Sequence, residues 1–435
     1  MQLNPEDLVV SRVPSADVES PYRPAGDRFV EEDQQVLFSS DASQLGQWLL
    51  QGQTPPCFEM AGPRRRTFAD PRELTCGIVT CGGLCPGVNN VIRALVLALT
   101  YGYGVGRVLG FRYGYAGLSS KSPREPMVLT PEVVDTIHQQ GGTVLSSSRG
   151  PQDAKDMVDT LLSRGVGALF TIGGDGTLRG TSALAEEIAR RNLAIPVVGI
   201  PKTIDNDIEW VDRSFGFVTA VEEAKRAISA AHVEARGALN GVGLVKLMGR
   251  QSGFIAAHAT LSSSDVNFCL VPEVRFALEG DGGLLRVLER RLERRHHAVI
   301  AVAEGAGQEL MKATLAQDAS GNARLGDVGS MLHSALGKWF SSQGMDVTIK
   351  YIDPSYMVRS LPANSVDSEF CLLLGQHAVH AAMAGRTNMM IGFWNQHFTH
   401  VPIPVAVRQR KQIDPDGELW QRVLDATGQP AKLAD

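Results

Sequence analysis

From residue 75 onward, short apolar segments alternate with longer segments of helical periodicity. Most of the short segments are almost continuously apolar, which is the pattern of parallel strands that are covered on both faces. The segment 366–386 predicts a helix, because Phe370, Leu373 and Leu374 follow helical spacing. The expected strands are 76–83, 107–111, 143–148, 168–174, 195–201, 241–249, 267–274, 297–305, 346–353 and 388–394.

Strands that alternate with helices predict an α/β fold with doubly wound sheets. About ten strands are many for one sheet of this kind, so we expect two Rossmann-like lobes with mainly parallel sheets flanked by helices. The expected first lobe takes 75–205 and part of 330–385, and the second takes 206–330 and part of 386–435. Residues 1–74 are rich in proline and turn formers, so we expect an N-terminal extension with little regular structure.

Composition and charge narrow the class of protein. The chain has 435 residues, 43% of them hydrophobic, and a formal net charge of -5, so a nucleic-acid partner is not indicated. No segment approaches the ~18 apolar residues of a membrane span, and the acidic N-terminus does not resemble a signal or transit peptide. Six cysteines are too few for a disulfide scaffold and suit a reduced, cytoplasmic enzyme.

Glycine-rich turns follow two of the expected strands at their carboxyl ends, where parallel sheets bind ligands. The first begins at Gly82 and enters a helix, so its backbone N–H groups and the helix N-terminus could hold a phosphate. The second is Gly-Gly-Asp-Gly-Thr at 173–177. Its glycines would admit a triphosphate, and Asp175 could hold Mg²⁺ directly or through water. Neither turn is a Walker A motif, and each alone could be a plain strand–helix turn.

Two carboxylates and a lysine follow the expected strand 195–201, namely Asp205, Asp207 and Lys202. A carboxylate at this position could accept a hydroxyl proton during phosphoryl transfer. The lysine could neutralise phosphate charge. The alternative is a salt-bridged surface loop.

Three further strand ends carry matching chemistry. Arg250 lies in a glycine-rich turn and could bind a phosphate or its transition state. Glu304 could accept hydrogen bonds from sugar hydroxyls, and Tyr356 with Arg359 could hold the distant phosphate of a phosphorylated substrate. Each of these residues could instead be an ordinary polar loop residue whose hydrogen bonds are made within the protein. Together, however, they indicate a phosphoryl-transfer site.

In their order along the chain, these motifs resemble the 6-phosphofructokinase family. The similarity extends from about residue 75 to about residue 405, and the surrounding sequence is similar to the longer ATP-dependent branch of plants, protists and some bacteria. The resemblance implies Mg-ATP and fructose 6-phosphate as substrates, Mg²⁺ as cofactor, an ATP-binding first lobe, a sugar-phosphate-binding second lobe and a homodimer or homotetramer. The motifs are GGLCPGVNNVIR (82–93), GGDGT (173–177), PKTIDND (201–207), MGRQSG (248–253) and AEG (303–305).

The resemblance also implies residue roles. Asp205 would be the general base toward the 1-hydroxyl, Arg250 would lie near the transferring phosphoryl group, and Asp175 would bind Mg²⁺. The implied ATP-binding residues are Gly82, Arg149, Gly150, Gly174, Asp175, Gly176 and Thr177. The implied substrate-binding residues are Thr203, Ile204, Asp205, Met248, Gly249, Arg250, Glu304, Tyr356, Met357, Val358 and Arg359.

Two positions bear on the phosphoryl donor, and they point in different directions. Pyrophosphate-dependent members of the family carry Asp where this chain has Gly176, so Gly176 favours ATP. Lys202 is typical of the pyrophosphate users, but the longer ATP-dependent branch has it too. Because a glycine leaves room for ATP and a nearby lysine does not exclude it, we expect ATP. A pyrophosphate-dependent enzyme is the alternative.

The sequence departs from the short bacterial enzymes at Gly241 and Tyr356, where those enzymes have an arginine and a histidine. How subunits share the 6-phosphate site is therefore left open, and the effector control of the short enzymes is not carried over. Lipid and NAD kinases share the Gly-Gly-Asp-Gly sequence but lack the other motifs. An inactive nucleotide-sensing subunit would be expected to have lost Asp175 or Asp205, and both are present.

Overall fold

The computed structural model describes residues 4–311 and 324–434. The described chain divides into two compact units. The first contains residues within Met1–Thr203, Ile208–Gly216 and Ser360–Arg410. The second contains residues within Ile204–Asp207, Phe217–Arg359 and Lys411–Asp435.

The first unit is built on a nine-stranded sheet. Its strands are β3 (Gln35–Leu37), β4 (Cys57–Met60), β6 (Thr75–Thr80), β7 (Arg107–Phe111), β8 (Met127–Val128), β9 (Val166–Gly173), β10 (Val197–Pro201), β16 (Met389–Trp394) and β17 (His397–Pro402). In space they follow the order β3-β4-β17-β16-β10-β9-β6-β7-β8. The five strands from β16 to β7 are parallel, and antiparallel strands are added at both edges. The central strands are buried along almost their whole length, as continuous apolar segments predict.

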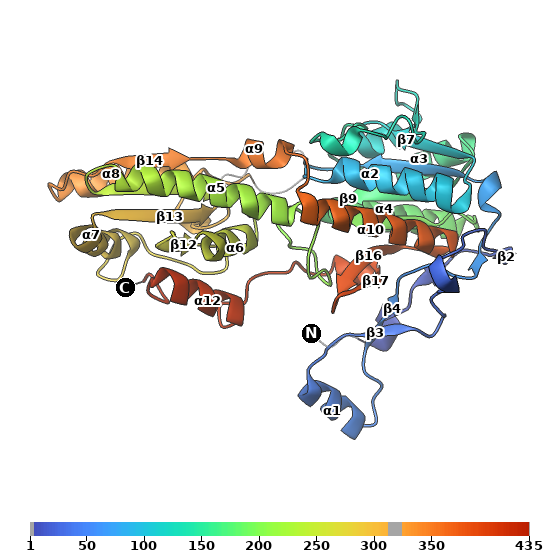
Figure 1. Ribbon diagram of the computed structural model, residues 1–435, viewed down its shortest axis with the longest axis horizontal. Coiled ribbons are helices and arrows are strands. Elements are labelled where there is room, and N and C mark those ends of the chain that lie inside the picture. Colours follow the sequence, from blue (N-terminus) through green and yellow to red (C-terminus); the bar gives the residue numbers. More distant parts are fainter. Residues whose placement is uncertain (1–3, 312–323, 435) are drawn as a thin grey trace. The chain divides into compact units, whose positions relative to one another are not determined.

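Paired helices flank this sheet (Figure 1). In one pair α2 (Val88–Leu97) packs on α10 (Ser365–Met383), and in the other α3 (Ala154–Ser163) packs on α4 (Asp175–Arg190). Gly375 of α10 approaches Ala94 of α2 so closely that an added Cβ would lie 2.6 Å from the alanine Cβ. The α2–α10 crossing therefore depends on a glycine.

The second unit contains a four-stranded, fully parallel sheet in the order β12-β13-β11-β14. Five helices pack around it: α5, α6, α7, α8 and α12 (Figure 1). The strands are β11 (Gly241–Leu247), β12 (Phe268–Leu270), β13 (His297–Ala303) and β14 (Ile349–Ile352). The helices are α5 (Phe217–Arg236), α6 (Phe254–Ser263), α7 (Leu284–Arg295), α8 (Val328–Ser342) and α12 (Glu418–Thr427).

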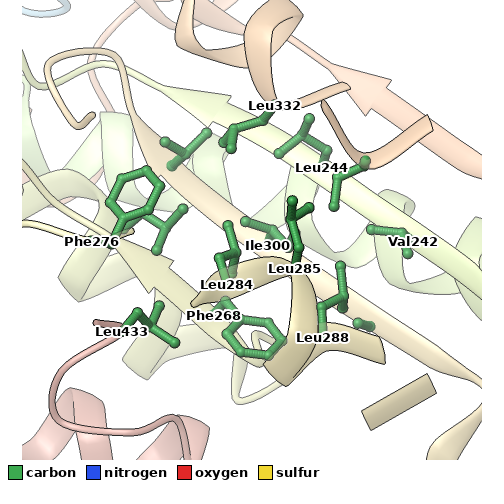
Figure 2. Packing of buried hydrophobic residues seen from close by; sticks show 14 of the residues in the cluster. Val242, Leu244, Phe268, Phe276, Leu284, Leu285, Leu288, Ile300, Leu332 and Leu433 are labelled. Atoms are coloured by element: carbon green, nitrogen blue, oxygen red, sulfur yellow. The ribbon is translucent and has the colours of Figure 1, made fainter. Parts of the chain in front are cut away.

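Successive side chains of β11 point to opposite faces of this sheet. A Cβ added to Gly243 would lie 2.9 Å from the Cβ of Ala231 in α5, so the glycine face admits a close helix. The intervening Val242 and Leu244 point into a fully buried cluster with Leu288 of α7 and residues of α8, which Figure 2 shows. Because a helix covers one face and an apolar core the other, this strand is apolar along most of its length.

The expected fold class is confirmed, since both units have parallel sheets flanked by helices. Nine of the ten expected strands are present, but 143–148 is not a strand. There the N–H of Val144 donates to the side chain of Asn89 at 3.0 Å and the N–H of Leu145 to Thr143 Oγ1 at 3.2 Å. Ser146 has a φ of 56°, which breaks an extended run. Side chains thus take the hydrogen bonds that a sheet ladder would have used.

The prediction of little regular structure in residues 1–74 is wrong. This region contains α1 (Ala42–Leu50) and short strands, and β3 and β4 extend the main sheet through β17. Arg64 is buried and forms an ion pair with Glu59 at 3.2 Å. Edge strands of three or four residues carry too little pattern to be recognised from sequence.

The C-terminal third is shared between the two units, and the structure gives its division finer bounds than the expected parts of 330–385 and 386–435. Residues 330–359 lie in the second unit, and 360–410 lie in the first. The reason is that β14 pairs with β11, whereas β16 pairs with β10. Strand pairing, which the sequence does not reveal, decides the unit to which each segment belongs.

Candidate active site

Three neighbouring parallel strands of the first unit, β10, β9 and β6, end at the same edge of the sheet. The loops that follow them contain Lys202, the run 174–177 and Gly82. Lys202 is 8% exposed, and its Nζ donates a hydrogen bond of 2.6 Å to the carbonyl of Gly83. This hydrogen bond therefore links the loop after β10 to the glycine-rich loop after β6.

The glycines at the start of α4 have different surroundings. A Cβ at Gly173 would lie 2.4 Å from the Cβ of Thr177, so that turn cannot hold a larger residue. A Cβ at Gly176 would meet nothing within 4 Å. Tyr115 donates a hydrogen bond of 2.7 Å to the carbonyl of Thr177 and so supports the first turn of α4. A helix N-terminus with open space at Gly176 suits a phosphate-bearing ligand.

Arg149 reaches the same edge because its loop is bonded to the turn at Gly82. Ser147 Oγ donates to the Gly82 carbonyl at 2.6 Å, and the Gly82 N–H donates to the Ser148 carbonyl at 3.1 Å. The Arg149 guanidinium lies 3.6 Å from the position of a Cβ on Gly83. Gly150, with a φ of 101°, allows the turn that follows.

One side chain at this site was missed by the sequence analysis. Arg410 Nε lies 2.9 Å from Oδ2 of Asp175, the first residue of α4. The two residues are separated by more than two hundred positions, and Arg410 stands in the ordinary polar run RQRKQ. No local pattern in the sequence could have indicated this contact.

In the second unit, Asp205 lies among charged groups. Its Oδ1 is buried and receives no hydrogen bond from the described residues. Burial, together with the negative charges of Asp207 and Glu304, raises the pKa of Asp205 to about 7. The backbone N–H of Arg250 and the charge of Arg359 act in the opposite direction. A carboxyl group with a pKa near neutrality is well matched to proton transfer.

The residues around Asp205 come from the carboxyl ends of β13, β11 and β14, which are neighbours in the sheet. Burial raises the pKa of Glu304, and the positive charges of Arg359 and Arg250 oppose that shift. Gly249 has a φ of 130°, and a Cβ there would lie 2.4 Å from the Ser252 carbonyl, so the turn that presents Arg250 requires glycine. Two carboxyl groups and two guanidinium groups therefore influence one another in this unit.

The other expected substrate residues fall into three groups. Thr203 is the last residue of its segment in the first unit, so the structure does not group it with the rest. Ile204, Met248 and Val358 have buried side chains. Tyr356 and Met357 are 83% and 68% exposed in the single chain.

Lys246 is a second residue that the sequence analysis missed. Its Nζ lies 3.1 Å from Asp327 and 2.9 Å from Asp353. Asp353 in turn accepts hydrogen bonds from Ser355, the first residue of α9 (Ser355–Ser360), which carries Arg359. A signal was present, because a lysine inside the otherwise apolar strand GVGLVKL needs a partner at the strand end.

Among residues 4–311 and 324–434, no group of three or more His, Cys, Asp or Glu side chains could hold a metal ion by itself. All six cysteines are free, and five of them are buried. Within the same described ranges, no helix combines the length and the apolar character that crossing a membrane requires.

Comparisons with known proteins identify the family of the chain. A family model described as phosphofructokinase matches residues 75–382. An ATP-dependent 6-phosphofructokinase of Amycolatopsis methanolica is 48% identical over 446 residues, covering 100% of this chain and 97% of that protein. One of Borreliella burgdorferi is 50% identical over 382 residues, covering 86% of each chain.

A solved structure, the pyrophosphate-dependent phosphofructokinase of Marinobacter aquaeolei, has a TM-score of 0.68 at 18% identity. The match covers 82% of this chain and 91% of that one. At this identity the similarity concerns the fold alone. The family model and the relative of Amycolatopsis methanolica lead to one conclusion: the chain belongs to the phosphofructokinase family.

Proposed function

We propose that this protein transfers the γ-phosphoryl group of Mg-ATP to the 1-hydroxyl of D-fructose 6-phosphate, the committing step of glycolysis. The observation that carries the proposal is the buried carboxyl group of Asp205, whose pKa is raised to about 7, among Arg250, Glu304 and Arg359. The names of the relatives, which are similar over most or all of the chain, support the same reaction.

Asp205 would act as the general base in the second unit. Ionised above its pKa of about 7, it would accept the proton of the 1-hydroxyl as the oxygen attacks phosphorus. Arg250 would stabilise negative charge on the transferring group. Glu304 would accept hydrogen bonds from sugar hydroxyls, and Arg359 would bind the 6-phosphate, with Thr203, Ile204, Met248, Gly249, Tyr356, Met357 and Val358 as further substrate-binding residues.

The first unit would bind the nucleotide at the N-terminus of α4. Its backbone N–H groups and the open space at Gly176 suit a polyphosphate. Gly82, Arg149, Gly150, Gly174 and Thr177 would complete the site. An aspartate at position 176, as in the pyrophosphate users, would project into that open space, so Gly176 supports ATP as the donor.

Lys202 does not oppose the choice of ATP. Its Nζ is bonded to the Gly83 carbonyl, where it fixes the phosphate-binding loop. A lysine in this position could serve either donor.

Asp175 fits a magnesium ion that arrives with the nucleotide. Mg²⁺ is commonly held by one or two carboxylates together with substrate phosphates. A single carboxylate at a phosphate-binding helix N-terminus meets that requirement. When bound, the ion would neutralise negative charge on the phosphate that is transferred. We further propose a cytoplasmic homodimer or homotetramer; the free, mostly buried thiols suit a reducing compartment.

The test is formation of fructose 1,6-bisphosphate from fructose 6-phosphate and Mg²⁺, with ATP or pyrophosphate supplied in parallel. Activity with ATP alone is expected. Activity with pyrophosphate alone would overturn the donor assignment but keep the roles of Asp205 and the sugar site. No turnover with either donor, from protein that still binds nucleotide, would favour a regulatory subunit.

A further inference from the structure

Residues 407–410, which end the last segment of the first unit, lie along the first two turns of α4. The guanidinium of Arg179 donates to the carbonyl of Val407 at 3.1 Å. One turn earlier on the same helix, Asp175 pairs with Arg410 at 2.9 Å. The backbone of Arg410 is also bridged to Ile208 in antiparallel fashion. The backbone of Arg410 is therefore fixed beside the helix N-terminus, and only its side chain has to move for the ion pair to change.

The guanidinium occupies the carboxylate that Mg²⁺ would use. The Asp175 side chain is 9% exposed and that of Arg410 28%. Because like charges repel strongly at such a partly buried position, a divalent ion and a guanidinium cannot both lie on one carboxylate oxygen. Binding of the metal ion at Oδ2 of Asp175 therefore has to displace Arg410.

A displaced arginine would not lack a partner. If a nucleotide binds at the N-terminus of α4, its phosphate oxygens lie near Asp175, the first residue of that helix. Guanidinium groups bind phosphate well, often through two parallel hydrogen bonds. The long side chain of Arg410 could turn from the carboxylate to a phosphate while its backbone stays bridged to Ile208.

We propose that Arg410 is an exchangeable cation: it neutralises Asp175 in the ligand-free protein, and it binds the nucleotide phosphates once Mg²⁺ has taken that carboxylate. The proposal rests on the proposed function for the identity of the metal and the nucleotide. Its consequence is that free Mg²⁺ binds poorly alone, because it must displace an arginine that then has no phosphate to bind. Metal and nucleotide binding are thereby coupled.

The first experiment measures Mn²⁺ affinity without nucleotide, by electron paramagnetic resonance, in the wild type, Arg410→Met and Arg408→Met. Arg410→Met should bind Mn²⁺ about 10-fold more tightly than the wild type, because the competing cation is gone. Arg408→Met is the matched control: it removes the same charge two residues away, from a surface ion pair with Asp7 at 3.0 Å. Adding Asp175→Asn to Arg410→Met should abolish the gain.

The second experiment measures Mg-ATP affinity by calorimetry in the same proteins. Arg410→Met should weaken it about 10-fold, Arg410→Lys should retain most of it, and Arg408→Met should leave it unchanged. Unchanged Mn²⁺ affinity in Arg410→Met would overturn the exchange. So would a gain in Mg-ATP affinity as large as the gain in Mn²⁺ affinity, because the displaced arginine would then contribute no phosphate contact. Thermal unfolding shows whether Arg410→Met folds. If it does not, the proposal is judged on Arg410→Lys, for which smaller changes in Mn²⁺ and Mg-ATP affinity are expected.

These measurements contain no sugar phosphate, so they separate the two proposals. A wild type that binds Mg-ATP but does not phosphorylate fructose 6-phosphate would refute the proposed function and leave the exchange to be judged on binding. A wild type that binds no Mg-ATP would overturn both.

Discussion

Asp205 and Asp175 both follow the carboxyl ends of parallel strands, but their surroundings are opposite. Asp175 begins a helix and pairs with Arg410 at 2.9 Å, so a cation and the helix N-terminus stabilise its charge. Asp205 has a buried oxygen without a hydrogen-bond donor among the described residues and two other carboxylates nearby, so its charge is disfavoured. In the proposed function, one residue type would thus serve as a metal ligand in one unit and as a proton acceptor in the other, with the environment deciding which.

The largest effect that tests this difference is expected from Asp205→Asn. The amide fills the same space but cannot accept the hydroxyl proton, so kcat should fall by about 10³-fold or more while KM for fructose 6-phosphate changes little. Steady-state kinetics and a direct sugar-phosphate binding measurement check this. Equal loss of binding and turnover would show that Asp205 positions the substrate and does not act as the base.

A second prediction concerns Lys246, which supports the residues proposed to bind the sugar phosphate. Lys246→Met breaks the contacts with Asp327 and Asp353. Since Asp353 holds the start of the helix that carries Arg359, KM for fructose 6-phosphate should rise about 10-fold, with a much smaller change in kcat.

The matched control for this variant is Lys350→Met, which removes a lysine on β14 whose ion pair with Glu234 is longer, 3.5 Å, and exposed. It should leave both kinetic constants near the wild-type values. Similar effects of the two substitutions would mean that the change reflects loss of a positive charge and not loss of the support for α9.

Asp205 and Arg410 show what the sequence could and could not predict. The sequence singles out Asp205 because the strand before it is continuously apolar and the polar residues begin abruptly after Pro201. Arg410 could not be found, since its position depends on the return of residues 360–410 to the first sheet through β16. The β-branched residues of 143–148 predict a strand, but the N–H of Val144 donates to the side chain of Asn89 instead of to a neighbouring strand, and only the fold brings Asn89 to that position.

A third prediction uses the pKa of Asp205. Because Asp205 must be ionised to act as the proposed base, kcat/KM should fall as the pH drops below about 7. The negative charge of Glu304 contributes to the raised pKa, so Glu304→Gln should lower the pKa of Asp205 and move the acid limb of the profile to lower pH by roughly half a unit. The pH dependence of kcat/KM in the two proteins measures this. A shift to higher pH would contradict the assigned electrostatics.

The smallest expected effect is on stability. A carboxyl group whose pKa is raised on folding, from 3.8 to about 7, makes the native state less stable as the pH rises between those two values, and the cost stays constant above them. Asp205→Asn removes that cost. The melting temperature should therefore rise by a few degrees at pH 8 and by less at pH 5.

Asp175→Asn provides the contrast, because it leaves Arg410 without its carboxylate partner. It should lower the melting temperature at pH 8 or leave it unchanged. Opposite signs for the two aspartate substitutions would confirm that one carboxylate is held ready for a proton at the expense of stability while the other is already neutralised. A gain in stability from both would mean that the Asp175–Arg410 pair does not stabilise the ligand-free protein.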